Sequence, residues 1–202
     1  MCTTALVSGL EIAALKQPER ETEAMREIEL KIRASLGEKG VLVSSPEDID
    51  GLSLRGYGVS EKKKLMLTFY EALFLVSKHI LQVDDEKTGK EVSFQNLLRR
   101  FQLVDEDAWV KYLIYRDLRS RGYVAREGFG LGIDFRVYER GEYGKETARY
   151  LIFGIQEGKP VSVEKLARTL KYAQSLKKKL VLAVINRRGE VVYYSLSQLT
   201  LK

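Results

Sequence analysis

The spacing of apolar residues changes near Gly122, and this change limits the folds open to the chain. Before Gly122, apolar residues recur every three or four positions, which is typical of helices; after it they alternate, which is typical of strands. Strands are expected over residues 123–126, 134–138, 150–155, 180–185 and 191–196, with a helix from Ser162 between the third and fourth. The run 180–185 is apolar on both faces and predicts an inner strand. The second half therefore predicts an αβββαββ sheet domain.

The first half predicts mostly helix. Apolar residues at helical spacing favour an amphipathic helix over residues 19–36, closed by Gly37. A second helix is expected from an N-cap at Ser60 to Ile80. Between and after them we expect a strand at 41–43, a polar loop at 44–51, a turn at 84–90, a helix at 93–101 and a helix from Asp105 or Glu106 to Gly122.

These elements divide the chain into three parts. A helical extension is expected over residues 1–40, a small mixed α/β domain over 41–104, and the sheet domain over 105–202. The last boundary is placed near Asp105 because the polar segment 104–107 separates two locally complete units. The fold class predicted is α/β (α+β), with a mixed sheet in each domain.

Composition excludes several classes of protein. A chain of 202 residues that is 45% hydrophobic and 31% charged is not expected to be disordered. Glu71 and Lys78 lie in or beside the longest apolar run, which argues against a membrane helix, and the N-terminus has no basic leader that would favour a secretory signal. Cys2 is the single cysteine, so an internal disulfide and a cysteine zinc site are both excluded, and a cytoplasmic location is expected.

The charge balance favours a polyanionic partner. The net charge is +6, and lysine runs at 62–64 and 177–179 add local basic character. The first run opens a predicted helix, so the helix dipole does not explain it, and solubility or phosphate contact remain as explanations. The helix from Ser162 carries cations on one face: Lys165, Arg168, Lys171 and, at its end, Lys178. They could follow a phosphate backbone, or they could form a solvated surface.

Two further side chains are candidates for proton transfer. Tyr138 ends a predicted strand and could act as an acid or base only if nearby cations favoured its ionised form; otherwise it is a sheet aromatic. His79 is the single histidine, and its place at the end of an apolar helix favours a structural role. From residues alone, the chain is a basic, two-part α/β protein with a candidate nucleic-acid face.

Several longer motifs resemble the archaeal tRNA-splicing endonuclease family. They are YLIYRDLRSRGYV at 112–124, GIDFRVY at 132–138, and YEALFL at 70–75, followed by YLI at 150–152 and SLKKKLVLAV at 175–184. The resemblance covers residues 40–202 and implies the family's restriction-endonuclease-like catalytic domain. It also implies cleavage of precursor tRNA at a bulge-helix-bulge, where a 2′-hydroxyl attacks the adjacent phosphate to leave a 2′,3′-cyclic phosphate and a 5′-hydroxyl, with no metal or small-molecule cofactor.

The resemblance implies a catalytic tyrosine, histidine and lysine. Tyr138 and Lys178 match the tyrosine and the lysine, whereas the histidine position is Thr147, with Ala148 as the one-residue alternative. Neither residue can exchange a proton near neutral pH. The arginine that helps to clamp a bulged base corresponds to Lys171, which stacks less well than a guanidinium.

Three interpretations follow. The leading interpretation is that this chain is a non-catalytic structural subunit of a heterotetramer that also contains a catalytic chain. Its C-terminal strand then pairs with a partner through Val191 to Tyr194, Leu196, Leu199 and Leu201; alternatively, these residues pack in the core. The second is an active endonuclease that uses Tyr138 and Lys178, with the histidine replaced by another group or removed deliberately. The third is an RNA- or DNA-binding module that borrows the fold.

Overall fold

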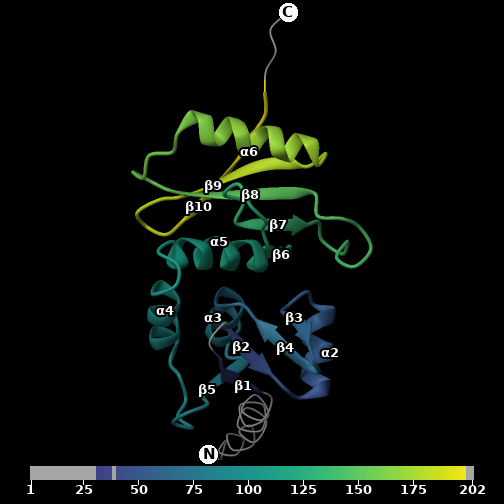
Figure 1. The fold of residues 1–202 in the computed structure, drawn as a ribbon, viewed down its shortest axis with the longest axis vertical. Helices are drawn as coiled ribbons and strands as arrows, with labels where there is room; N and C mark the ends of the chain where they lie inside the picture. The colour runs from purple at the N-terminus through teal and green to yellow at the C-terminus, as the bar shows by residue number, and fades with distance from the viewer. Residues whose placement is uncertain (1–30, 38–39, 199–202) are drawn as a thin grey trace, which may run out of the picture. The chain divides into compact units, whose positions relative to one another are not determined.

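The computed structural model describes residues 31–37 and 40–198 and contains two five-stranded mixed sheets (Figure 1). The predicted α/β architecture is confirmed. The first sheet and its helices comprise β1 (Ile32–Leu36), β2 (Val41–Val43), α2 (Pro46–Leu54), β3 (Val59–Glu61), β4 (Lys64–Leu67), α3 (Phe69–Ser77), β5 (Leu81–Asp85) and α4 (Phe94–Gln102). The second comprises α5 (Ala108–Ser120), β6 (Val124–Glu127), β7 (Phe135–Tyr138), β8 (Tyr150–Gln156), α6 (Val163–Ser175), β9 (Lys179–Ile185) and β10 (Val191–Leu196).

The prediction that the helix over residues 19–36 continues to residue 36 is wrong. Residues Ile32–Leu36 form β1, which pairs antiparallel with β2 and parallel with β5. Ala34 and Leu36 are buried, so the alternation of this segment is a strand pattern, and hydrogen bonds to β2 and β5 outweigh its helical spacing. The rest of that predicted helix, and Leu199 and Leu201 at the other end, lie outside the described residues. The domain boundary near Asp105 falls between α4 and α5 and stays a prediction.

The helix predicted from Ser60 is also too long. Its first part is the β3–β4 hairpin, and α3 begins only after Thr68. Lys62 and Lys63 form the two-residue turn, with φ values of 43° and 69°. The first lysine run thus lies on a hairpin turn and does not open a helix. The loop predicted at 44–51 is wrong as well, because Pro46 begins α2.

Replacing Lys63 by glycine is expected to stabilise the protein. A side chain at a left-handed φ costs roughly 1–2 kcal/mol, and glycine avoids this cost. The free energy of unfolding should rise by about 1 kcal/mol, which raises the melting temperature by about 2–4 °C in a chain of this size. Thermal unfolding followed by circular dichroism measures this. Lys64→Gly, within β4, is the matched control and should lower the melting temperature; a lower value for Lys63→Gly would contradict the prediction.

The second sheet lies between two helices, with α5 on one face and α6 on the other (Figure 1). Its strand order is β10-β9-β8-β7-β6, so β9 is an inner strand, as predicted. Helix α6 provides the crossover that the parallel pair β8 and β9 requires. Helix α6 buries Thr169 and Ala173, whereas Val163 and Leu176 are 81% and 36% exposed. Thr169 satisfies its hydroxyl by donating to Leu131 O at 2.8 Å.

A buried ion pair joins the two halves. Arg126 on β6 contacts Glu71 on α3 at 3.2 Å and donates to the carbonyls of Gly56 and Gly58 at 3.0 and 2.6 Å. Glu71 also accepts from the backbone amides of Thr68 and Gly58. Each charged group is therefore held by several hydrogen bonds, as burial requires. Among the described residues, no helix is long and apolar enough to cross a membrane.

Candidate active-site edge

The residues that the sequence indicated meet at one end of the strands of the second sheet. Strand β7 ends there and the parallel strands β8 and β9 begin there, with Val137 opposite Tyr150 and Tyr150 opposite Lys179. The backbone continues this pairing outward, since Arg149 N donates to Val137 O and Lys179 N donates to Arg149 O. Residues that follow β7 or precede β8 and β9 therefore meet. We call this region the active-site edge; it contains Tyr138, Thr147 and Lys178.

Lys178 lies beyond α6 and not on it. The helix ends at Ser175, Lys177 turns the chain with a φ of 55°, and Lys178 N donates to Ala173 O at 2.9 Å. The half-buried Lys178 side chain points to the segment before β8, where Nζ donates to Thr147 Oγ1 at 3.4 Å and to Ala148 O. The ammonium group is thus held at the position where the histidine is expected.

Thr147 is the residue of that segment that faces out. Its side chain is exposed, whereas Ala148 is 4% exposed. Of the two alternatives for the missing histidine, Thr147 is therefore the position from which a side chain reaches the edge. His79, the single histidine of the chain, follows α3 at a φ of 58° on the first sheet's side of the fold. The active-site edge therefore has no imidazole from this chain.

Tyr138 lies on the neighbouring strand and is half-buried. Its ring meets that of Tyr143 edge to face at 5.0 Å, and its backbone pairs with Val124. Tyr138 makes no hydrogen bond with Thr147 or Lys178. The structure brings Thr147 and Lys178 into contact, and places Tyr138 beside them through the sheet.

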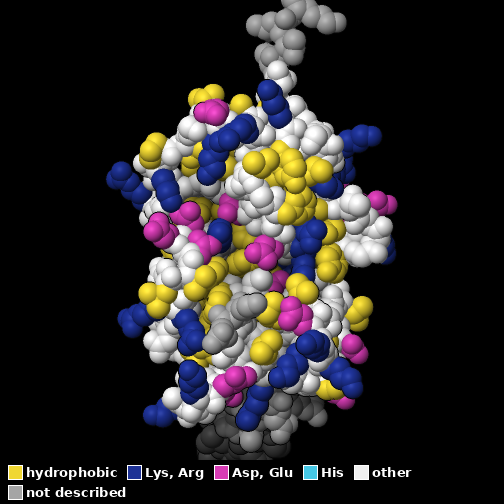
Figure 2. All heavy atoms as spheres, viewed as in Figure 1, with side chains coloured by type: hydrophobic (Ala, Val, Ile, Leu, Met, Phe, Trp, Pro, Cys, Tyr) yellow, Lys and Arg dark blue, Asp and Glu magenta, His cyan; other side chains and the backbone are white. Residues whose placement is uncertain are grey.

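Helix α6 carries the three other predicted contact residues, and they are not equivalent. All three side chains are exposed, and the Lys165 ammonium also lies 5.1 Å from the centre of the Phe153 ring. Figure 2 shows Lys and Arg side chains gathered over α6 at the top of the view, with Asp and Glu groups below them. The basic stripe predicted on α6 is thus exposed at Lys165, Arg168 and Lys171, and its contact with RNA stays a prediction.

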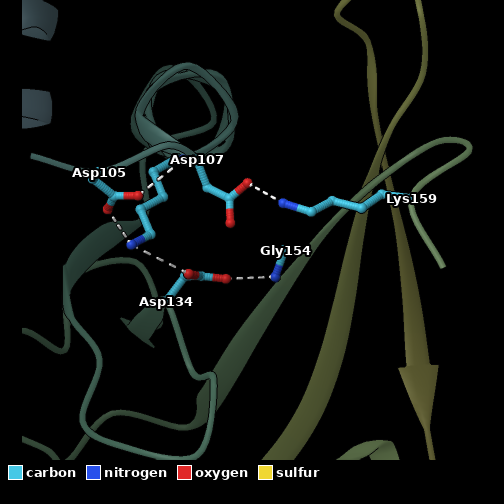
Figure 3. Close-up of polar contacts among 6 residues, drawn as sticks. Asp105, Asp107, Asp134, Gly154 and Lys159 are labelled. Atoms are coloured by element: carbon cyan, nitrogen blue, oxygen red, sulfur yellow. Dashed lines mark hydrogen bonds and ion pairs between the residues drawn. The ribbon is translucent and has the colours of Figure 1, made fainter. Parts of the chain in front are cut away.

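An acidic cluster that the sequence did not indicate lies at the start of α5 (Figure 3). Lys111 pairs with Asp105 and lies 3.9 Å from Asp134, while Asp107 pairs with Lys159 at 2.6 Å. Asp134 also accepts from Gly154 N at 2.7 Å, and burial raises the pKa of its carboxyl. The cluster ties α5 to β8. The spacing of these residues along the chain does not predict that they form a cluster.

Comparison with known proteins agrees with this geometry. The family description "tRNA intron endonuclease, catalytic C-terminal domain" matches residues 108–193, and "tRNA intron endonuclease, N-terminal domain" matches residues 32–98. The chain is 34% identical over 170 residues to a tRNA-splicing endonuclease of Methanococcus vannielii, covering 84% of this chain and 96% of that protein. This chain belongs to the tRNA-intron endonuclease family. A Pyrococcus furiosus relative with the same name is 36% identical over 140 residues, covering 69% of this chain and 79% of the relative.

Every residue of the active-site edge lies inside the part that matches the catalytic domain of the tRNA-intron endonuclease family. The matched N-terminal domain begins at residue 32, the first residue of β1. This agrees with the pairing of β1 into the first sheet.

Proposed function

We propose that this chain is a structural, non-catalytic subunit of a cytoplasmic, heterotetrameric tRNA-splicing endonuclease. In this proposal it binds precursor tRNA and positions a catalytic chain of the same family, which cuts at bulge-helix-bulge introns and leaves 2′,3′-cyclic phosphate and 5′-hydroxyl ends. The observation that carries the proposal is the presence of Thr147, bonded to Lys178, where proton transfer needs a titrating group.

The chemistry explains why this substitution matters. Attack by a 2′-hydroxyl needs a base, departure of the 5′-oxygen needs an acid, and the crowded phosphorane needs a cation nearby. Tyr138 and Lys178 could supply two of these roles. Thr147 cannot supply the third, since its hydroxyl neither gains nor loses a proton near neutral pH.

The outer edge of β10 supports a role in assembly. This strand pairs only with β9 within the described residues, which leaves its other edge open. Val192 and Tyr194 are 47% and 55% exposed, so they are not core residues. An open edge that carries apolar side chains favours pairing with another chain, and in our proposal that chain is a family partner.

To test the assembly, the chain is co-expressed with the catalytic subunit of the same organism, and the mass of the complex is measured by native mass spectrometry. We expect two copies of each chain. Tyr194→Asp should break the complex, whereas Trp109→Asp, an exposed aromatic residue on α5, should leave it intact. A catalytic subunit that assembles and cuts fully without this chain would contradict the proposal.

Arg168 and Lys171 are expected to contact RNA phosphates. Each phosphate contact adds roughly 0.7–0.9 to the slope of log K against log salt. The double variant Arg168→Gln/Lys171→Gln should therefore bind bulge-helix-bulge RNA more weakly and lower that slope by about 1.5. Fluorescence anisotropy over a salt series measures it. The control Lys62→Gln/Lys63→Gln, on the β3–β4 turn, should keep the slope; equal slopes for both double variants would contradict the assignment.

A second candidate is an active endonuclease chain. It is favoured by the retention of Tyr138 and Lys178 at one edge of the sheet, because losing one acid or base costs about 10²–10⁴ in rate without abolishing every reaction. Under this alternative the chain alone cuts RNA slowly, and Lys178→Ala removes that activity.

A further inference from the structure

Residues 55–58 join α2 to β3 and contact the second half of the chain; we call them the linking segment. Arg126 on β6 donates to the carbonyl groups on either side of Tyr57, at 3.0 and 2.6 Å. Arg119 on α5 donates to Arg55 O at 3.0 Å, and its guanidinium lies 3.9 Å from the centre of the Tyr57 ring. Two arginines on different elements of the second half therefore hold the linking segment in one position.

Gly56 brings the linking segment very close to two residues of the second half. Its φ is 75°, and a Cβ built on it would come 2.5 Å from Val124 Cγ1 and 3.1 Å from Tyr143 Cε1. Carbon atoms in favourable contact lie about 3.5–4.0 Å apart, so a side chain does not fit here. Val124 is β-branched, and its restricted rotamers prevent it from turning away at little cost. Only glycine therefore allows this close approach.

Val124 and Tyr143 are both neighbours of Tyr138. Val124 lies directly opposite Tyr138 in the antiparallel pair of β6 and β7, so their side chains lie next to each other on one face of the sheet. The Tyr143 ring meets the Tyr138 ring edge to face, with the ring centres 5.0 Å apart and an angle of 86° between the planes. Packed side chains thus connect Gly56 to the tyrosine of the active-site edge along two routes.

We propose that Gly56 is a positioning residue, which sets the place of the Tyr138 ring at the active-site edge through Val124 and Tyr143. Tyr143 also belongs to the segment between β7 and β8 that carries Thr147, so the same contact supports both sides of the edge. The inference rests on the proposed function only in taking this edge as the endonuclease site of the fold. Positioning matters there, because a displacement of about 1 Å at a reacting group can cost roughly 100-fold in rate.

The first test is spectroscopic and uses the full chain, labelled with ¹³C at Cζ of its 11 tyrosines. The Tyr138 signal is assigned by its loss in Tyr138→Phe. Gly56→Ala should displace this signal by more than its line width. Gly89→Ala is the matched control, because Gly89 has a φ of 65° and a Cβ built on it would meet no atom within 4 Å. It should leave the Tyr138 signal in place.

A second variant keeps Gly56 and loosens the linking segment. Arg119→Met removes the hydrogen bond to Arg55 O and the cation on the Tyr57 ring, so it should also displace the Tyr138 signal. Its control is Arg116→Met, an exposed position on the same helix, which should not. If Gly56→Ala does not fold, Arg119→Met decides alone. A Tyr138 signal that no folded variant of the segment displaces overturns the positioning role and leaves the proposed function standing.

A cleavage measurement adds the functional consequence. In the Thr147→His background, Gly56→Ala should lower kcat by about 10- to 100-fold with KM unchanged, whereas Gly89→Ala should change neither. An unchanged kcat, or a change in KM alone, overturns the proposal. If Thr147→His does not cut, the Tyr138 signal decides. If the wild-type chain cuts by itself, only the proposed function fails, and Gly56→Ala should then lower the kcat of the wild type.

Discussion

Replacing Thr147 by histidine is expected to give the chain cleavage activity on bulge-helix-bulge RNA. The exposed position 147 contacts Lys178 and lies beside Tyr138, so an imidazole there adds the one titrating group that the active-site edge lacks. A positioned acid or base contributes roughly 10²–10⁴-fold in rate, and the rate of the variant should exceed that of the wild type by about this factor. Lys178 keeps its bond to Ala148 O in the variant, so its position should be retained. Single-turnover cleavage followed on a gel measures the effect.

Two further variants separate proton transfer from side-chain size. Thr147→Gln is polar and similar in length to histidine but does not titrate, so it should bring no gain. Thr147→His/Lys178→Ala should lose the gain, because the cation near the phosphorane is removed. A Thr147→His protein that melts like the wild type and still does not cut would show that Tyr138 and Lys178 are not placed for catalysis.

Removing the charge of Arg126 is expected to destabilise the fold more than any surface change. Arg126→Met leaves the Glu71 carboxylate buried without its cation, and leaves the carbonyls of Gly56 and Gly58 without donors. Breaking a buried ion pair in this way costs roughly 3–5 kcal/mol. Urea unfolding should show this loss. Lys159→Met, which breaks the exposed pair with Asp107, is the control and should cost less than about 1 kcal/mol.

The loss in Arg126→Met should depend on pH in a defined direction. Burial raises the pKa of Glu71, and Arg126 opposes that rise, so the variant raises the pKa further. A carboxyl group whose folded pKa lies above its unfolded value, about 4.3, favours the folded state most below that value and loses this contribution as pH rises through the folded pKa. The deficit of the variant should therefore be smallest near pH 4 and grow toward neutrality. A deficit that grows on acidification would contradict this account of Glu71.

Much of the second half could be predicted from the sequence because its signals are local. The Ser162 cap, which accepts from Lys165 N, and the doubly apolar run of β9 each specify their element without distant partners. Segment 32–36 could not be assigned in this way. Ile32 and Leu36 fit a helix by their spacing of four, and the segment is a strand because it pairs with β2 and with β5, which is more than forty residues away. The β3–β4 hairpin was missed because its turn residues are lysines, without the glycine or asparagine that signals such turns.

The candidate site was predictable only in part. Tyr138, Thr147 and Lys178 are far apart in the chain, and only the order β9-β8-β7 brings their strand ends together. These positions were predicted from the resemblance to the endonuclease family, and the spacing of the residues along the chain was not sufficient to predict them. A pocket on this sheet, lined by Tyr123, Arg140 and Tyr193, could not be predicted, because its lining comes from α5 and the segment after it, four strands and the turn after β7.

In our proposal, this chain supports cleavage without performing it. The most direct measurement is cleavage of a bulge-helix-bulge RNA by the purified full-length chain, alone and with the catalytic subunit of the same organism. We predict no cleavage by the chain alone, and cleavage at both bulges, with 2′,3′-cyclic phosphate ends, once the partner is added. Cleavage at the bulges by the chain alone, lost in Lys178→Ala, would contradict the claim.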